Sequence, residues 1–302
     1  FATRSLHGDM ESLLGEQQFY MVRYTGAIVN LELEERLQAL ESVAAHITPA
    51  ILASDKAMQA FLEQRETLQS LFNAGNFVTR LDGNPIADVP LSAKRLGLNV
   101  AHRDYMVTAL KQGKSAIGKP VLGRSLKTPV FSIVAPIKDP AGKVIGALVG
   151  VIDLNRPNFL TRVMRDQSEK AGYYVLIAPQ HGLIVSSTKP ELVMKPMAPT
   201  GVNRLLDRFI AGYEGPGVTM TSAGVEEVGA GVRIPAAGWL LILTLPTRDA
   251  FAAIDAMEQR MRLAAIFFTL LAGLLTWALL KSQLAPMTAA AEVLARRGDP
   301  DQ

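Results

Sequence analysis

The segment from Asp9 to Ile47 has apolar residues at helical spacing along its length. It contains no proline and is rich in Glu, Gln, Leu and Ala. Residues three and four apart share one face of a helix, so the pattern predicts one long amphipathic helix, or two nearly collinear ones, that Pro49 ends or kinks. We expect a helix this long to pack along a partner helix or to span both halves of the protein. The apolar residues form two series with a two-residue shift in phase: Leu14, Met21, Tyr24, Ile28 and Leu31, then Leu33, Leu37, Leu40, Val43 and Ile47.

A region of short β-rich runs and turns follows this helix. The turn cluster Asp82–Pro85 separates two β-rich runs and predicts a hairpin. A short helix is predicted at Arg103–Gln112, ended by Gly113. Strands are predicted at Asn76–Arg80, Ile86–Val89, Pro129–Ile137 and Val144–Ile152.

The same order of elements then repeats. A second turn at Gln180–Gly182 predicts another hairpin, and Asn203–Ala211 predicts a short helix ended by Gly212. The two halves share a pattern rather than identical residues, and they predict an α+β fold with two modules of antiparallel strands. The strands of the second module are predicted at Tyr173–Ala178, Leu183–Ser187, Val218–Ser222, Glu226–Ile234 and Trp239–Leu245.

One segment predicts a transmembrane helix. Leu263–Leu280 has no charged residue and is flanked by Arg262 and Lys281. Its 18 residues extend about 27 Å as a helix, close to the thickness of a bilayer core. A buried core helix is the alternative. The positive charges on the two sides of the span balance, so they do not set its orientation.

Composition narrows the class of protein. The 302 residues include 31 Lys+Arg and 28 Asp+Glu, a net charge of +3 that gives no reason to expect a nucleic-acid partner. There is no cysteine, which excludes disulfides, thiolate metal sites and a cysteine nucleophile. The sequence contains no nucleophile elbow, P-loop or metalloprotease motif. It therefore predicts no catalytic residue, no metal and no cofactor.

Several segments together resemble the double Cache sensor domains of bacterial receptors. The resemblance covers Leu13 to Ile254, and the second half is most similar to the variant found before diguanylate cyclase and phosphodiesterase domains. Leu284–Gly298 resembles the opening of a HAMP linker. The segments that carry the resemblance are Asn99–Leu110 (NVAHRDYMVTAL), Gly118–Pro120 (GKP), Pro129–Pro136 (PVFSIVAP), Gly142–Gly146 (GKVIG), Val151–Leu154 (VIDL), Asn203–Gly215 (NRLLDRFIAGYEG), Ala237–Trp239 (AGW) and Leu245–Phe251 (LPTRDAF).

The resemblance implies a PAS-like fold in each module and a division of the chain into six parts. We expect the stub of an earlier transmembrane segment at residues 1–4. The expected parts are a long N-terminal helix (1–49), a membrane-distal Cache module (50–158), a membrane-proximal Cache module (159–246), a connecting helix (247–262), a transmembrane helix (263–280) and the start of a HAMP-like linker (281–302).

The resemblance also implies a location and a partner. Residues 1–262 would be periplasmic and residues 281–302 cytoplasmic, in a receptor of the bacterial inner membrane. Such receptors are often homodimers through the first helix, and they usually bind a small molecule in the distal module.

Arg103 is the leading candidate for ligand binding. On the predicted helix it shares an apolar stripe with Met106, Val107 and Leu110. A guanidinium on an apolar face needs a partner, and a ligand carboxylate would supply one. In the Cache family an arginine at this place often holds a carboxylate. The alternatives are an ion pair with an acid such as Asp153, or a side chain that reaches solvent from the start of the helix.

Five further residues are candidates, each with a structural alternative. Tyr105 offers a hydroxyl or a pocket wall, or packs half-buried at the rim of the module. Ser132 interrupts an apolar strand, where it could face the pocket or be a satisfied core hydroxyl. Lys127 and Arg124 lie in a loop that could close over an anion, or are simply solvated. In amino-acid-binding Cache domains an aspartate at the place of Asp153 holds the ligand amine, although Asp153 could instead cap the connector that follows.

The sequence departs from the amino-acid-binding group at two places. Met106 replaces an aromatic residue, and the expected tyrosine and aspartate are missing near Val121–Gly123. The ligand is therefore expected to be a small anionic metabolite, either a carboxylate or an amino acid. From the likeness of the second module, the output is expected to be synthesis or breakdown of cyclic-di-GMP. The alternatives are a dimerisation or protein-docking module without a ligand, or the sensor of a histidine kinase or chemoreceptor.

Overall fold

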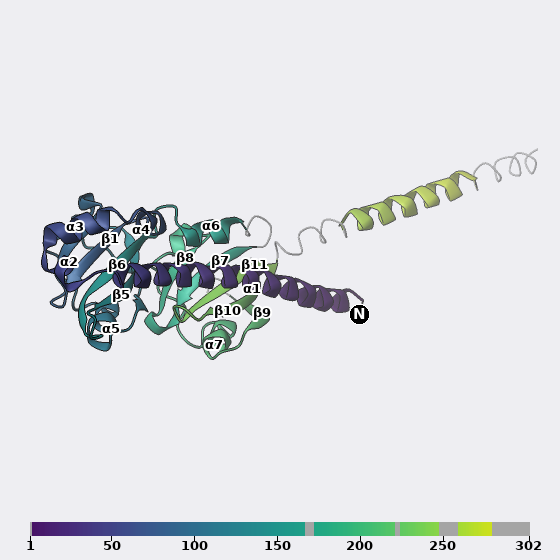
Figure 1. Ribbon diagram of the computed structural model, residues 1–302. Helices are drawn as coiled ribbons and strands as arrows, with labels where there is room; N and C mark the ends of the chain where they lie inside the picture. Colours follow the sequence, from purple (N-terminus) through teal and green to yellow (C-terminus); the bar gives the residue numbers. More distant parts are fainter. Residues whose placement is uncertain (1, 167–171, 221–223, 248–258, 280–302) are drawn as a thin grey trace, which may run out of the picture. The chain divides into compact units, whose positions relative to one another are not determined.

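A computed structural model describes residues 2–166, 172–220, 224–247 and 259–279, with side chains from residue 12 onward. The chain divides into two compact units, Phe1–Thr247 and Arg248–Gln302. The first unit contains a long helix and two antiparallel sheets, as the sequence predicted (Figure 1).

Helix α1 (Ala2–Ala44) is continuous and lies against both sheets (Figure 1). Its buried face includes Val22, Val29, Leu33 and Leu40. Two glycines on the same face allow close approach to the second sheet. A Cβ at Gly15 would lie 2.9 Å from Pro216 Cβ, and one at Gly26 would lie 2.7 Å from Val232 Cγ2. The expectation that this helix spans both halves of the protein is confirmed.

The two apolar series of this helix differ in how deeply they are buried. Leu33 and Leu40 of the second series are buried, but Tyr24 and Leu31 of the first series are 60% and 54% exposed. In the first half the core face is formed partly by polar residues such as Gln18 and Thr25. The phase shift in the sequence therefore marks the point beyond which apolar residues of the helix lie deeper in the core, since Met21 and Ile28 of the first series are only partly buried against it.

The long helix ends before Pro49, and Pro49 begins the next helix. Helix α1 ends at Ala44, and α2 (Pro49–Ala53) starts after Thr48, whose side chain accepts a hydrogen bond from Ile51 N. Proline suits the first position of a helix because no intrahelical bond is lost there. Two more short helices, which were not expected from the sequence, follow as α3 (Asp55–Glu63) and α4 (Glu66–Leu71).

The first sheet has the strand order β2-β1-β6-β5-β3, with β4 also paired to β5. Alternate residues of β5 face opposite sides, so that Phe131 and Ile133 pack with α1 while Val130 and Val134 pack with α5 (Asp104–Gln112). The strands are β1 (Asn76–Arg80), β2 (Pro85–Val89), β3 (Ala116–Ile117), β4 (Val121–Leu122), β5 (Pro129–Lys138) and β6 (Val144–Asp153), and a 3-10 turn, η1, covers Leu91–Ala93.

The second sheet has the order β8-β7-β11-β10-β9 and the same arrangement of layers. Helix α7 (Arg204–Ile210) packs on the face opposite α1, and α6 (Phe159–Asp166) connects the two halves (Figure 1). The strands are β7 (Tyr173–Ala178), β8 (Leu183–Ser187), β9 (Gly215–Met220), β10 (Glu226–Ile234) and β11 (Trp239–Pro246), with 3-10 turns η2 (Pro179–His181) and η3 (Pro190–Leu192).

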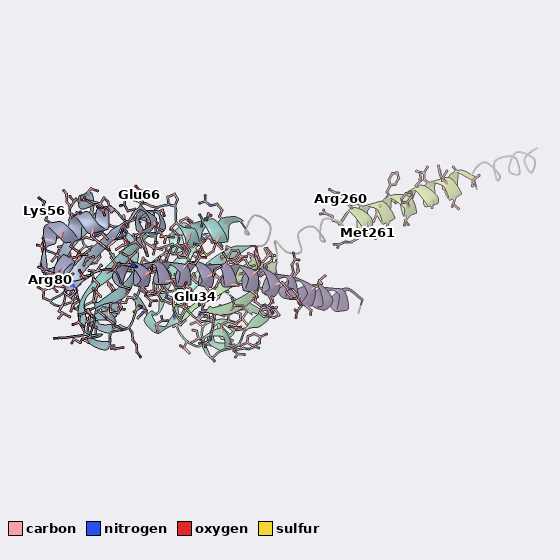
Figure 2. The ribbon with its side chains drawn as sticks, in the orientation of Figure 1. Glu34, Lys56, Glu66, Arg80, Arg260 and Met261 are labelled. Carbon is pink, nitrogen blue, oxygen red and sulfur yellow. The ribbon has the colours of Figure 1, made fainter. Side chains whose placement is uncertain are left out.

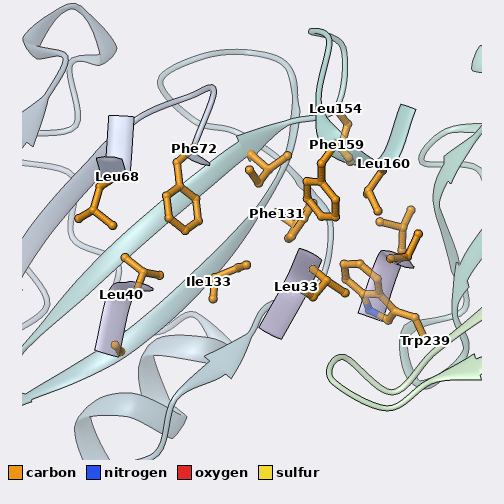
Figure 3. Close-up of a cluster of buried hydrophobic side chains, with 14 of the residues drawn as sticks. Leu33, Leu40, Leu68, Phe72, Phe131, Ile133, Leu154, Phe159, Leu160 and Trp239 are labelled. Atoms are coloured by element: carbon orange, nitrogen blue, oxygen red, sulfur yellow. The ribbon is translucent and has the colours of Figure 1, made fainter. Parts of the chain in front are cut away.

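One hydrophobic cluster joins the two halves (Figure 3). The Phe131 ring of the first sheet meets the Trp239 ring of the second edge to face, with ring centroids 5.2 Å apart. Leu33 of α1 belongs to the same cluster. Because these large side chains are fully buried, the two sheets and α1 form a single core.

The second unit contains the helix Gln259–Leu279, which is long and apolar enough to cross a membrane. Arg260 and Met261 lie near its start (Figure 2). The helix agrees with the predicted span at Leu263–Leu280, whose last residue is outside the described part of the chain. Most of the predicted connecting helix (247–262) and all of the predicted HAMP-like linker (281–302) also lie outside the described residues.

Candidate ligand-binding site

A cavity of about 70 Å³, here called the first cavity, lies between α5 and the first sheet. Four of the six predicted site residues line it: Arg103, Tyr105, Arg124 and Ser132. Lys127 and Asp153 do not. The apolar wall includes Phe77, Val130 and Val151 from the sheet, with Leu98, Val100 and Leu126 from the loops.

Arg103 lies immediately before α5 rather than within it. The helix begins at Asp104, and Arg103 is its N-cap residue with extended backbone angles (φ −71°, ψ 142°). The prediction that Arg103 shares a helical stripe is therefore wrong, although the residue still lines the cavity. Among the described residues, the half-buried guanidinium makes no hydrogen bond or salt bridge with another side chain. The alternative of an ion pair with Asp153 is not formed, because Asp153 pairs with Arg156.

Tyr105 and Ser132 meet in the cavity from α5 and β5. Burial raises the pKa of Tyr105, while hydrogen bonding with Ser132 and the charge of Arg103 oppose that rise. The phenol therefore stays neutral and keeps a proton to donate. Gly118 leaves room for the ring, since a Cβ there would lie 2.5 Å from Tyr105 Cδ1.

Arg95 also lines the first cavity, and sequence reasoning missed it. Its Nε donates to Asp88 Oδ1 at 2.8 Å, and its guanidinium lies 5.2 Å from the Phe77 ring centroid. The side chain is buried, and its Nη1 has no hydrogen-bond partner. Burial lowers the pKa of Arg95 while the charge of Asp88 opposes that change, and an arginine remains protonated in either case.

The remaining predicted residues lie at or beyond the rim. Arg124 is exposed, and its Nη2 lies 3.4 Å from His102 Nε2. Lys127 is exposed in a turn with a left-handed backbone (φ 56°). Asp153 is buried at the end of β6, where it accepts hydrogen bonds from Thr128 Oγ1 at 3.1 Å and Asn155 N at 2.9 Å. These contacts hold the connector after β6, the structural alternative that the sequence analysis gave for Asp153.

The first cavity is positively charged. Arg95, Arg103 and Arg124 line it, and no aspartate or glutamate does so among the described residues. A guanidinium donor without a partner, a second guanidinium and two hydroxyl groups together suit a carboxylate. The described part of the chain holds no cluster of His, Asp or Glu that could bind a metal ion.

The chain matches the profile of a known family and the fold of solved structures. A family profile described as Cache domain matches residues 6–254. No curated protein sequence matches the chain.

Solved structures with a similar fold are ligand-binding regions of bacterial receptors. The ligand-binding domain of the Pseudomonas aeruginosa PAO1 amino acid chemoreceptor PctB, in complex with L-Arg, gives a TM-score of 0.64 at 17% identity, over 82% of this chain and 93% of that chain. The ligand-binding domain of the Pseudomonas fluorescens chemoreceptor CtaA, in complex with L-isoleucine, gives 0.61 at 20% identity, over 83% and 98%. At these identities the likeness concerns the fold.

An extracellular ligand binding receptor from Desulfohalobium retbaense gives a TM-score of 0.58 at 13% identity. The match covers 76% of this chain but 40% of that protein, so the chain spans less than half of its length.

Proposed function

The chain belongs to the Cache domain family, and we propose that it is the ligand-sensing region of a bacterial inner-membrane receptor that binds a small carboxylate in the first cavity. Cache domains are sensory ligand-binding modules rather than enzymes, so this chain is a sensor region. We assign no catalytic step of the output to it.

The observation that carries the proposal is the buried Nη1 of Arg95, which has no hydrogen-bond partner and lies in a cavity that Arg103 also lines. A buried donor without a partner costs free energy of about 1–3 kcal/mol, which a ligand oxygen would recover. Tyr105 and Ser132 can donate to a second oxygen. Asp88 neutralises Arg95, which leaves the positive charges of Arg103 and, at the rim, Arg124 for an anionic ligand.

A monocarboxylate fits the first cavity better than an amino acid does. The related PctB and CtaA structures hold amino acids, whose ammonium group needs an acceptor. In the described part of this chain, no acidic side chain lines the first cavity, and Asp153 is already engaged by Thr128 and Arg156. The cavity of about 70 Å³ also favours a short chain such as acetate or propionate. A small amino acid is the alternative ligand.

The helix Gln259–Leu279 supports a membrane location, with residues 1–262 on the periplasmic side and residues 281–302 in the cytoplasm. A ligand regulates such a receptor if it binds one conformation better than another. Cyclic-di-GMP synthesis or breakdown is the output that we propose from the resemblance of the second module. Regulation of a chemoreceptor or a histidine kinase is the alternative.

The exposed apolar residues of α1 support a homodimer. Leu13, Tyr20, Tyr24 and Leu31 are each more than half exposed, and they are spaced seven, four and seven residues apart. This is the spacing of a coiled-coil seam. The same surface would serve the alternative function, a dimerisation module without a small-molecule ligand.

Thermal unfolding of the full chain in detergent tests the carboxylate site. We expect acetate, propionate or glycine to raise the Tm, because a ligand at a hundred times its Kd stabilises the folded state by about 2.7 kcal/mol. Arg103→Ala should abolish the shift. Lys127→Ala, which removes a nearby charge outside the cavity, is the matched control and should preserve it. A shift that survives Arg103→Ala, or no stabilisation by any carboxylate, would contradict the assignment.

A further inference from the structure

A second cavity, of about 190 Å³, lies between α7 and the second sheet. Most of its wall is apolar, from residues such as Ile242 of β11 and Leu206 and Phe209 of α7. Gly231 of β10 leaves room beside Phe209, since a Cβ there would lie 2.9 Å from Phe209 Cδ2. This second cavity therefore occupies the same layer of the second module as the first cavity does in the first.

One carboxylate lines this apolar cavity. Glu227 of β10 is only 5% exposed, and both of its oxygens accept from the Tyr173 hydroxyl, at 2.9 and 3.0 Å. That hydroxyl has a single proton, so it meets only a small part of the hydrogen-bonding capacity of the carboxylate. Among the residues that the structure describes, no Lys, Arg or His forms a salt bridge with Glu227.

A buried negative charge without a cation is costly, and such a group is normally paired. Lys189 is exposed, and its Nζ lies 3.5 Å from the Tyr173 ring centroid without forming a salt bridge with Glu227. Tyr173 cannot offset the negative charge, because a phenol ionises only to an anion; burial raises the pKa of Tyr173 to about 12, and Glu227 also favours the neutral phenol.

A second polar group lines the cavity. Thr244 of β11 interacts with the Tyr173 hydroxyl, where it opposes the rise in the pKa of the phenol, and its buried Oγ1 has no other partner. A hydroxyl oxygen and a carboxylate are both acceptors for an ammonium group, which has three protons to donate. The apolar residues of the wall would then surround an alkyl chain.

We propose that the second cavity is a separate binding site for a small organic cation, a protonated alkylamine whose ammonium group pairs with Glu227 and Thr244. The site is independent of the carboxylate site and has the opposite charge. Glu227 pairs in register with Pro246, which precedes Thr247, the last residue of the first unit. An amine bound there contacts the strand by which the chain leaves the sensor domain.

Isothermal titration of the full chain in detergent tests this site. The probes are n-alkylammonium ions from methyl to pentyl, with n-butanol and butyrate as neutral and anionic controls. We expect saturable binding of at least one ammonium ion and none of the butanol at the same concentration. Glu227→Gln keeps the shape of the side chain and an acceptor for Tyr173, and it should weaken ammonium binding by at least about tenfold.

Arg103→Ala serves as the matched control, because it removes a charge from the first cavity and should leave ammonium binding unchanged. This result also tests the two binding sites independently, because the carboxylate site can be refuted without refuting the ammonium site, and the reverse. Binding that is equal in wild type and Glu227→Gln, or no saturable binding by any of the ammonium ions, would overturn the proposal.

A measurement on the wild-type chain covers the case in which Glu227→Gln does not fold. The methyl NMR signals of Ile184 and Ile242, which line the second cavity, should shift on addition of the ammonium ion. The signal of Ile133, in the core of the first module, should not. Equal shifts at all three residues, or none, would contradict the assigned location.

Discussion

At the scale of single residues, Asp88 and Arg95 form a buried ion pair beside the first cavity. The Asp88 side chain is fully buried and accepts from both the backbone N and the side chain of Arg95, each at 2.8 Å. In the sequence, Lys94 and Arg95 are two adjacent basic residues that would suit an exposed loop. Only the fold of the turn after η1, where Lys94 takes a left-handed conformation (φ 51°), places Arg95 against Asp88. Arg103 was chosen as a candidate from apolar neighbours that are close in sequence, whereas the partner of Arg95 is not part of any local pattern.

Arg95→Leu should destabilise the chain by about 3–5 kcal/mol, because it leaves the Asp88 charge buried without its cation. The double variant Asp88→Asn/Arg95→Leu leaves no buried charge without a partner, so it should recover part of the lost free energy of unfolding. The two values can be compared from urea unfolding of each variant in the same detergent. A double variant as unstable as Arg95→Leu alone would show that the stranded charge is not the cause.

At the scale of elements, the longer strands were predictable, whereas the two-residue strands β3 and β4 and the close packing of α1 on the second sheet were not. The observed β10 has the bounds that the sequence predicted, Glu226–Ile234, because its apolar and polar residues alternate between two faces. In α1 the buried face includes Gly15, Thr25 and Gly26, which carry no hydrophobic signal. Glycine fits at these positions because the second sheet lies too close for a larger side chain. The sequence of the helix alone does not reveal this contact.

Gly26→Ala tests this close contact. Alanine favours a helix over glycine by about 1 kcal/mol, so an exposed site would gain stability. At Gly26 the new Cβ would lie 2.7 Å from Val232 Cγ2, and overpacking of this kind costs about 1–3 kcal/mol. We therefore expect a lower Tm. Ser42→Ala, at an exposed position of the same helix, is the control and should change the Tm little. A higher Tm for Gly26→Ala would contradict the assigned packing.

At the scale of the whole first unit, two sheets of like topology share one helix and differ in the charge of their cavities. The order of elements in each module could be predicted from the repeat of hairpin, helix and strands. The cavity charges could not, because each is assembled from distant segments: Glu227 meets Tyr173 across 54 residues. A site of this kind can be recognised only when the pairing and register of the strands that carry its residues are known.

The same helix also has an exposed apolar seam, from which we predict a dimer of the whole chain. Tyr24 and Leu31 are exposed on α1 and lie one heptad apart. Leu31→Arg should raise the dimer dissociation constant by at least about tenfold, because it places a charge in a coiled-coil seam. Sedimentation of the full chain in detergent measures the change.

Leu91→Arg is the matched control, because Leu91 is similarly exposed but lies in η1, away from this helix. It should leave the dissociation constant unaltered. A chain that is monomeric before any substitution would refute the dimer directly. If Leu31→Arg and Leu91→Arg weakened association equally, the exposed seam of α1 would not be the interface, and carboxylate sensing would then have to proceed through some other contact between subunits.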